Sequence, residues 1–312
     1  MRKRPDVLLV VSPPLGLAVP AILLSRLWRV PYVFDVEDFQ PDAAADMRML
    51  PSWALNFLYM VEKAAYRHAR LVSTLTPKMR KKIIDKGVAE DKVELIEPRM
   101  DDSLVNLLPE EGRAFRQCYD LGEKFLVTHS GNMGLKQGLD VVLDAAALNC
   151  DDDSTLFLFV GDGTDCERIQ CRAAEMKLKN VRFLPLLSQA DFRGLMAASG
   201  LCLVTQQQSV AEIVFPSKVV TYLAAGRPIV ASVNLDCEVA QVIQESGAGR
   251  VVDAENPEAL LAAIRELRAE DLGKVGQNAR GYASVRWSAA RVLGHLERSL
   301  TTAAGSQMGP VA

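Results

Sequence analysis

The sequence has few histidines and cysteines, and their spacing does not indicate a metal site or a disulfide framework. Of 312 residues, 3 are histidine and 6 are cysteine. No pair of cysteines forms a C-x-x-C motif, and no histidine lies at metal-ligand spacing from them. A chain of this length buries enough core to fold without disulfides. We therefore expect reduced thiols in a cytoplasmic protein.

A long uninterrupted hydrophobic run is also lacking. The apolar stretch 7–24 follows three basic residues, as in a signal peptide or an anchor, but three prolines interrupt it: Pro13, Pro14 and Pro20. Such spacing fits a strand, a turn and a helix better than one membrane-spanning helix. No small-residue cleavage site follows the run. The sequence therefore predicts neither a signal peptide nor a membrane span.

The sequence has no strong excess of charge of either sign. The net charge is −3, so nucleic acid is not an expected partner. Residues 1–100 carry 16 Lys and Arg against 12 Asp and Glu, and the rest carries 20 against 27. This asymmetry is either chance or the mark of a first part that faces something anionic.

The predicted helix 77–86 is basic, with Lys78, Arg80, Lys81, Lys82 and Lys86. The first domain also has Trp53, Phe57 and Tyr59 as possible interfacial aromatics. This combination predicts a peripheral contact with the inner face of the plasma membrane. The alternative is a solvated basic face over buried core aromatics.

Short apolar runs alternate with helical patterns along the chain. Strands that alternate with helices indicate βαβ units and a parallel sheet, and wholly apolar strands indicate a sheet covered on both faces. The predicted strands are 7–11, 32–36, 71–75, 93–96, 125–129, 155–160, 181–184, 201–205, 229–232 and 250–252. The predicted helices are 15–28, 51–69, 77–86, 138–148, 164–177, 188–198, 217–225, 236–246, 256–268 and 271–300, the last with a break near Ser288.

The acidic segment 99–124 looks irregular and is the best candidate for a domain boundary. It contains Pro109, Gly112 and Gly122. We therefore predict an α/β protein with a partial N-terminal domain over 1–110 and a second domain over 111–300. The small-residue tail 301–312 is expected to be disordered.

One loop of the second domain has the composition of an anion site. Residues 129–138 follow a predicted strand and open a helix. Gly131 and Gly134 let backbone amides approach an anion, the helix start adds partial positive charge, and Lys136 adds a full charge. The G-K-[ST] sequence of a P-loop is absent. A tight turn with a solvated lysine would have the same residues.

Three further loops lie at carboxyl ends of predicted strands, where open α/β sheets bind ligands. The first is Gly161-Asp162-Gly163. In the second, Ser217 is predicted to be a helix N-cap, because serine is common at that position. Gly226 and Pro228 are predicted to end the helix. In the third, Glu238 could accept hydrogen bonds from sugar hydroxyls. Each loop alone fits an ordinary turn or a capped helix.

The order and spacing of these loops resemble a known family. The relevant segments are Ser130-Gly131-Asn132-x-Gly134-x-Lys136-Gln137-Gly138, Val160-Gly161-Asp162-Gly163, Phe183-Leu184-Pro185 and Pro216-Ser217-Lys218-x-x-Thr221-Tyr222-Leu223-Ala224-Ala225-Gly226-Arg227-Pro228. With Asp38-Phe39-Gln40-Pro41-Asp42-Ala43-Ala44 and Glu62-x-x-x-Tyr66-x-x-Ala69, they resemble the retaining GT-B glycosyltransferases of family four (group 1). The similarity is to the branch that builds bacterial exopolysaccharide, capsule and lipopolysaccharide chains, and it covers about residues 5–300.

The resemblance implies two Rossmann-like domains with a donor cleft between them. Lys136 would bind the donor diphosphate, and Asp38 and Glu238 would make polar contacts around the sugar. The main chain at Phe183 and Leu184 would hold the base. The remaining donor contacts would be Gly131, Asn132, Gly134, Gly161, Asp162, Gly163, Ser217, Lys218 and Thr221. No metal or other cofactor is expected, because positive groups and helix ends take that role.

The implied function is transfer of a hexosyl group from a nucleotide-diphosphate sugar to a lipid-linked or saccharide acceptor. Several positions depart from the family pattern. Asn132 stands in place of an arginine, Ile213 and Thr221 in place of two glutamates (with Glu212 beside the first), and Asp35 in place of a histidine. The departures at Asn132 and Thr221, together with a missing N-terminal Gly-rich loop, favour the alternative of a non-catalytic nucleotide-sugar-binding remnant or partner subunit. A sugar-nucleotide epimerase of the same fold is a third hypothesis.

The first domain matches the family pattern only after its first strand and Gly-rich loop, so we expect about four strands where a Rossmann half has about six. Strand 7–11 would then form a free sheet edge. A free apolar edge predicts a dimer, or pairing with a complementing N-terminal segment.

Overall fold

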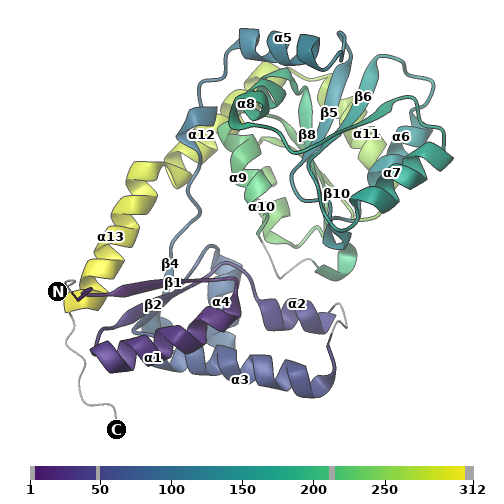
Figure 1. Ribbon diagram of the computed structural model, residues 1–312. Helices are drawn as coiled ribbons and strands as arrows, with labels where there is room; N and C mark the ends of the chain where they lie inside the picture. Colours follow the sequence, from purple (N-terminus) through teal and green to yellow (C-terminus); the bar gives the residue numbers. More distant parts are fainter. Residues whose placement is uncertain (1–3, 47–49, 211–214, 306–312) are drawn as a thin grey trace. The chain divides into compact units, whose positions relative to one another are not determined.

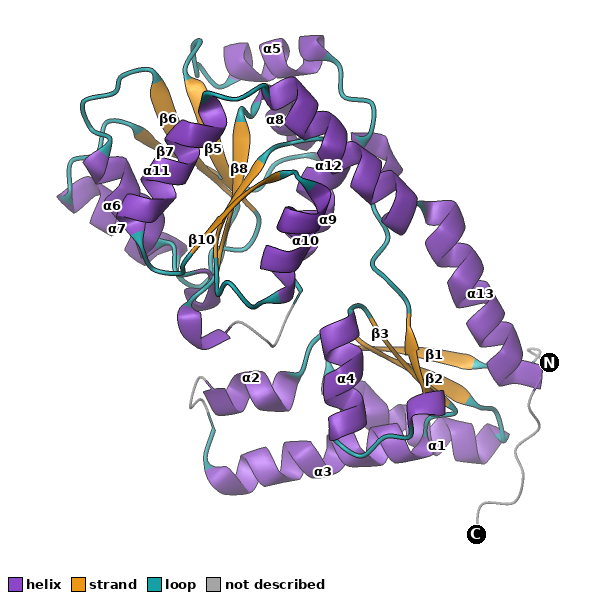
Figure 2. Cartoon of the chain, turned by 180° about the vertical axis from the view of Figure 1, so that it is seen from behind, coloured by secondary structure: helices purple, strands orange, loops and turns teal. Residues whose placement is uncertain are grey.

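The computed structural model describes residues 4–46, 50–210 and 215–305. Figure 1 and Figure 2 show two parallel sheets, each flanked by helices. The chain divides into two compact units. One is built on Met1–Arg99 and Ala289–Ala312, and the other on Met100–Ala211 and Pro216–Ser288. The predicted α/β class with two Rossmann-like domains is therefore confirmed.

The first unit has a four-stranded parallel sheet in the order β1-β2-β3-β4. Its strands are β1 (Leu8–Ser12), β2 (Tyr32–Val36), β3 (Leu71–Thr74) and β4 (Val93–Leu95). Its helices are α1 (Ala18–Trp28), α2 (Gln40–Asp46), α3 (Ser52–His68), α4 (Pro77–Asp85) and α13 (Ala289–Gly305). The ring of buried Phe34 in β2 contacts that of Tyr66 in α3, and the hydroxyl of buried Tyr32 donates to the carbonyl of Ala65 in the same helix. Helix α13 also packs against β2.

Strand β1 lies at the edge of this sheet. Within the described part of the chain its hydrogen-bonded neighbour is β2 alone, with Leu8 opposite Tyr32 and Ser12 opposite Val36. Leu9 and Val11 keep 42% and 36% of their surface exposed. The prediction of a free edge at 7–11 is confirmed for these residues, and its pairing with another strand stays a prediction.

The second unit has a six-stranded parallel sheet in the order β10-β9-β8-β5-β6-β7. Its strands are β5 (Phe125–Ser130), β6 (Thr155–Val160), β7 (Val181–Leu184), β8 (Leu201–Thr205), β9 (Ile229–Ser232) and β10 (Gly249–Val252). Its helices are α5 (Pro109–Cys118), α6 (Asp140–Leu148), α7 (Cys166–Glu175), α8 (Gln189–Ala198), α9 (Ser217–Ala224), α10 (Glu238–Ser246), α11 (Pro257–Arg268) and α12 (Leu272–Trp287). Strands β6 and β8 are buried along their whole length, as expected for a sheet covered on both faces.

The observed units differ from the predicted domains at both ends of the second domain. The segment that looked irregular contains α5, which begins with Pro109 at a position where a missing N–H is tolerated. Gly112 lies so close to the main chain of Ala197 in α8 that a methyl group there would meet it at 2.9 Å. This glycine therefore permits close helix packing and does not break the helix. At the other end, α13 belongs to the first unit and continues to Gly305, so residues 301–305 are helical.

The six cysteines, all within the described residues, form no disulfide bond. Among residues 4–46, 50–210 and 215–305, no helix combines the length and the apolar character needed to cross a bilayer.

Candidate functional site

The predicted anion-binding loops meet at the carboxyl edge of the second sheet. Strands β5, β6 and β7 are adjacent, and their last residues are in register: Ser130 lies opposite Val160, which lies opposite Leu184. The loops that follow these strands therefore leave the sheet at the same level. Such an edge is where open α/β sheets bind ligands.

The loops after β5 and β6 are in direct contact. The amide of Met133 donates to the carbonyl of Asp162 at 2.8 Å, and the amide of Gly131 donates to the carbonyl of Val160 at 2.9 Å. A methyl group on Gly161 would overlap the carbonyl of Gly131, and one on Gly163 would overlap the carbonyl of Met133. Gly161 and Gly163 are therefore required by the packing of one loop on the other, whatever ligand is bound.

Tyr222 of α9 fixes the start of the first loop. Its buried hydroxyl accepts a hydrogen bond from the amide of Ser130 at 3.0 Å and lies 3.0 Å from the Ser130 hydroxyl. Sequence reasoning did not assign Tyr222 a role. A tyrosine inside an apolar helix looks like a core residue, and only the contact between α9 and β5 shows its polar role.

The side chain of Lys218 lies beside His129 and Gly131, at the start of the same loop. Its Nζ is 3.4 Å from Nε2 of His129, and its Cε is near the open side of Gly131. Burial lowers the pKa of Lys218 to about 8. Burial, and then the charge of Lys218, lower the pKa of His129 well below its usual value. Among the described residues no carboxylate forms an ion pair with Lys218.

Lys136 lies further along the loop, in the short 3-10 turn Leu135–Gln137. Its side chain is partly exposed, and its carbonyl accepts a hydrogen bond from the amide of Gln207. Asn132 is exposed, and the side chain of Gln137 accepts a hydrogen bond from the amide of Gly134 at 3.0 Å. The loop is thus held by its own main chain and by Gln137.

The start of α9 differs from the prediction. The N-cap is Pro216, Ser217 is the first helical residue, and no side chain caps the helix. The prediction of Ser217 as N-cap was wrong because proline, with its fixed φ of −68°, already sets the chain direction one residue earlier. The N-cap residue therefore gives the first-turn amides of α9 no side-chain acceptor, as suits an anion-binding helix start. Thr221 donates from its hydroxyl to the carbonyl of Ser217 at 3.2 Å, and Glu212 and Ile213 lie outside the described residues.

A pocket of about 530 Å³ opens beside the second loop. It is lined by Gly161, Asp162, Cys166, Gln170, Phe183, Leu184, Pro185 and Leu186. It thus contains both residues expected to hold a base, and Phe183 stacks on Phe159 with ring centroids 4.9 Å apart. Sequence reasoning missed Cys166 and Gln170, because helical residues one turn apart show their common face only after α7 is placed on the sheet.

The two predicted sugar contacts belong to different units. Glu238 is the first residue of α10, which follows β9 at the same edge of the second sheet, and it is partly exposed. Asp38 follows β2 in the first unit. Next to it, Phe39 is fully buried, with the ammonium groups of Lys82 and Lys86 at 4.9 and 5.1 Å from its ring centroid.

The acidic and aromatic motif residues of the first unit, Asp42, Glu62 and Tyr66, have structural partners. Lys86 pairs with Glu62 at 2.6 Å and also with Asp42, and Lys82 pairs with Asp42 at 3.3 Å. Tyr66 donates to Glu62 at 3.1 Å. Arg80 also pairs with Glu90 at 3.1 Å, so at least three of the five basic residues in the segment expected to face a membrane pair with carboxylates of the same unit. The exposed aromatics lie instead on α3, where Trp53 is 76% and Phe57 is 56% exposed.

The carboxyl edge of the first sheet is acidic and partly buried. Ser73 donates to Asp35 at 2.7 Å. Burial raises the pKa of Asp35, and burial together with Asp35 raises the pKa of Glu37. Asp35 thus replaces the family's histidine with a carboxyl group that protonates more readily than usual.

Two family models match the chain. Residues 114–282 match the family model Glycosyl transferases group 1, and residues 1–99 match a Glycosyl transferase 4-like domain. WcaI of Escherichia coli (strain K12), which carries the name of a colanic acid biosynthesis glycosyl transferase, is 30% identical over 273 residues. That match covers 85% of this chain and 67% of WcaI. WbjE of Pseudomonas aeruginosa, named as a glycosyltransferase, is 28% identical over 57% of this chain and 42% of its own length.

Solved structures show the same fold. HepE of Anabaena, in complex with UDP, superposes with a TM-score of 0.78 at 20% identity, over 95% of this chain and 79% of HepE. WaaG, a glycosyltransferase involved in lipopolysaccharide biosynthesis, superposes with a TM-score of 0.69 at 19% identity, over 88% of this chain and 75% of its own. At these identities the structures establish the GT-B fold alone. With the family model matching more than half of its length, the chain belongs to the group 1 glycosyltransferases.

Proposed function

We propose that this protein transfers a hexosyl group from a nucleotide-diphosphate sugar to a lipid-linked or saccharide acceptor in cell-surface polysaccharide synthesis. The observation that carries the proposal is Lys218, a largely buried ammonium with no carboxylate partner among the described residues, beside a glycine loop and an uncapped helix start. These groups complement a diphosphate. HepE, which has the same fold, has been crystallised with UDP and with UDP-glucose.

The proposed roles follow from charge and position. Lys136, Lys218 and the amides of Gly131–Gly134 and Ser217 bind the diphosphate and stabilise its negative charge as it leaves. The pocket at Phe183 and Leu184 takes the base. Asp162 and Gly163 pack against the first loop, and Asn132, Thr221 and Glu238 provide polar groups for ribose and sugar. This arrangement needs neither a metal nor another cofactor.

The test is a titration with UDP, GDP and dTDP of the parent protein and of Lys136→Ala. We expect the variant to lose about 1–3 kcal/mol of binding free energy for whichever nucleotide binds, the usual range for a charged hydrogen bond. Lys179→Ala removes an exposed lysine of the same unit and is the control. Equal affinities of parent and Lys136→Ala would remove Lys136 from the site.

We further propose that the outer face of α3 makes the peripheral membrane contact. Trp53, Phe57 and Met60 recur at helical spacing on one face and are 76%, 56% and 59% exposed. Lys63 and Arg67 extend this face toward the helix end and are exposed. Exposed aromatics flanked by cations are typical of helices that lie in an anionic lipid surface.

Co-sedimentation with vesicles of neutral and of anionic phospholipid tests this contact. Trp53→Ser/Phe57→Ser should reduce binding to anionic vesicles severalfold, because each aromatic side chain loses buried apolar area. Val285→Ser, at a 70% exposed apolar position of the other unit, should bind like the parent. Binding that ignores lipid charge, or that survives the double substitution, would refute the proposal.

A second candidate function is a non-catalytic nucleotide-sugar-binding subunit. Thr221 favours it, because its hydroxyl bonds to the helix main chain where the family commonly has a carboxylate for ribose. A protein that binds nucleotide sugars but neither transfers nor hydrolyses the sugar, across a panel of polyprenyl-linked and oligosaccharide acceptors, would support this alternative.

A further inference from the structure

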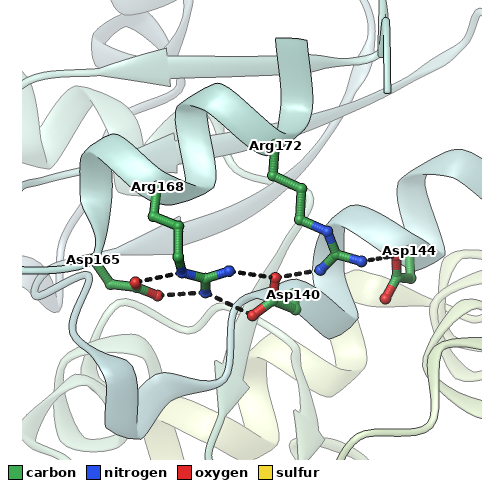
Figure 3. A network of polar contacts seen from close by, with 5 residues as sticks. All are labelled: Asp140, Asp144, Asp165, Arg168 and Arg172. Atoms are coloured by element: carbon green, nitrogen blue, oxygen red, sulfur yellow. Dashed lines mark hydrogen bonds and ion pairs between the residues drawn. The ribbon is translucent and has the colours of Figure 1, made fainter. Parts of the chain in front are cut away.

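Arg168 joins the helices that follow the two glycine loops. Asp165 immediately precedes α7, and Asp140 is the first residue of α6. Arg168 of α7 binds both carboxylates with both arms of its guanidinium group. Its Nε and Nη2 are each 2.7 Å from an oxygen of Asp165, and its Nη1 and Nη2 are 2.9 and 2.7 Å from the oxygens of Asp140. Figure 3 shows this double bidentate contact.

Each of the two carboxylates belongs to a residue that follows one of the loops in the sequence, Asp140 after the first loop and Asp165 after the second. The amide of Asp165 donates to the carbonyl of Met133 at 2.9 Å, so Asp165 is tied to the first loop by its main chain and to Arg168 by its side chain. The side chain of Asp165 is 4% exposed, so few water molecules can replace Arg168. Asp140 begins the helix that the first loop enters. Arg168 therefore fixes the spacing between the starts of α6 and α7.

The neighbouring Arg172 makes a similar contact without reaching the loops. It lies one turn further along α7 and pairs with Asp140 and, at 2.7 Å, with Asp144 (Figure 3). Both partners belong to α6. Arg172 therefore joins the same two helices but has no link to Asp165.

We propose that Arg168 is a positioning residue of the diphosphate site, which holds the loops Ser130–Gly134 and Gly161–Gly163 together so that their amides converge on the phosphates. The inference rests on the proposed function for the identity of the ligand. Arg168 touches no donor atom itself and acts through Asp165 and Asp140. It also neutralises two carboxylates that would otherwise repel a diphosphate bound at the neighbouring loop.

A comparison of Arg168→Ala with Arg172→Ala tests the proposal, since both variants lose an arginine that joins α6 and α7. The first measurement is amide hydrogen exchange of residues 130–139 in the ligand-free protein. We expect faster exchange in Arg168→Ala than in Arg172→Ala, because only the former frees Asp165. Equal exchange in the two variants would overturn the proposal, and this result does not depend on any ligand.

The second measurement is binding of UDP, GDP and dTDP and of the corresponding nucleosides. We expect Arg168→Ala to bind the diphosphate about tenfold more weakly than Arg172→Ala, with unchanged nucleoside binding, because displaced amides lose the phosphates and not the base. Arg168→Lys should restore little, since an ammonium cannot hold two carboxylates bidentately.

The two measurements separate the two hypotheses. If the parent binds none of the nucleotides, the proposed function fails while the exchange data still decide whether Arg168 joins the loops. If the parent binds a nucleotide diphosphate and the two alanine variants bind it equally, the positioning role fails and the proposed function stands.

Discussion

Replacing Lys218 by methionine should stabilise the ligand-free protein and weaken its binding of nucleotide diphosphate. Lys218 keeps its charge in a largely buried position beside His129, and burial lowers its pKa from 10.5 to about 8. At about 1.4 kcal/mol for each tenfold change in proton affinity, holding the proton there disfavours the folded state by roughly 3 kcal/mol at neutral pH. Methionine fills similar space without the charge, so the gain in unfolding free energy should approach that value.

The pH dependence gives this prediction a second signature. The folded-state pKa of Lys218 lies below the unfolded value, so between pH 8 and 10.5 the unfolded state binds more protons. The stability contribution of Lys218 in the parent should therefore rise with pH across this window. The advantage of Lys218→Met should be largest below pH 8 and vanish near pH 10.5.

The assays are urea unfolding at several pH values and calorimetric titration with the nucleotide that binds the parent. We expect Lys218→Met to lose about 1–3 kcal/mol of binding free energy while it gains unfolding free energy. Lys179→Met, at an exposed position, should change neither quantity measurably. A variant that is less stable than the parent at pH 7, or that binds nucleotide equally well, would refute the reasoning.

Two further predictions concern glycine packing and the sheet edge. Gly161→Ala should lower the unfolding free energy by about 1–3 kcal/mol and weaken nucleotide binding, because its methyl group overlaps the Gly131 carbonyl. Gly281→Ala, in the interior of α12 with open space around it, should instead stabilise the protein by about 0.5–1 kcal/mol, and chemical denaturation would measure both. The parent should self-associate in a concentration series by sedimentation velocity, through the edge of β1, and Leu9→Lys/Val11→Lys should reduce this association. A parent that is monomeric at every concentration would contradict the edge pairing.

The secondary structure could be predicted well because it depends on local patterns. Strand 32–36 was predicted at its observed bounds, since Pro31 precedes it and its residues are β-branched or aromatic at most positions. The break near Ser288 was predicted and separates α12 from α13. By contrast, α5 was missed because Pro109 and Gly112 are turn residues in most contexts. Only packing against α8 explains a glycine inside that helix.

The positions of the loops in the candidate site could be predicted from the sequence, but the residues that hold these loops in place could not. The glycine and lysine positions follow from strand ends and turn chemistry, which the sequence displays. Tyr222, Arg168 and the pairing of Asp165 with Arg168 depend on which loops become neighbours, and this depends on the strand order. The spacing of 30 residues between Gly131 and Gly161 carries no signal that one rests on the other.

Residues that contact a ligand can be told apart from residues that only hold the loops of the site. For Lys218, proposed to bind the diphosphate, burial disfavours the charge when no anion is bound, so its removal should raise stability and lower affinity. A packing glycine such as Gly161 serves both the fold and the ligand, so its substitution should lower both. A positioning residue such as Arg168 has a neighbour, Arg172, that joins the same two helices, so affinity and loop exchange should differ between their variants. The three kinds of residue therefore differ in how their substitution changes unfolding free energy, ligand affinity and loop exchange. Measuring these quantities on the same set of variants assigns each residue its role.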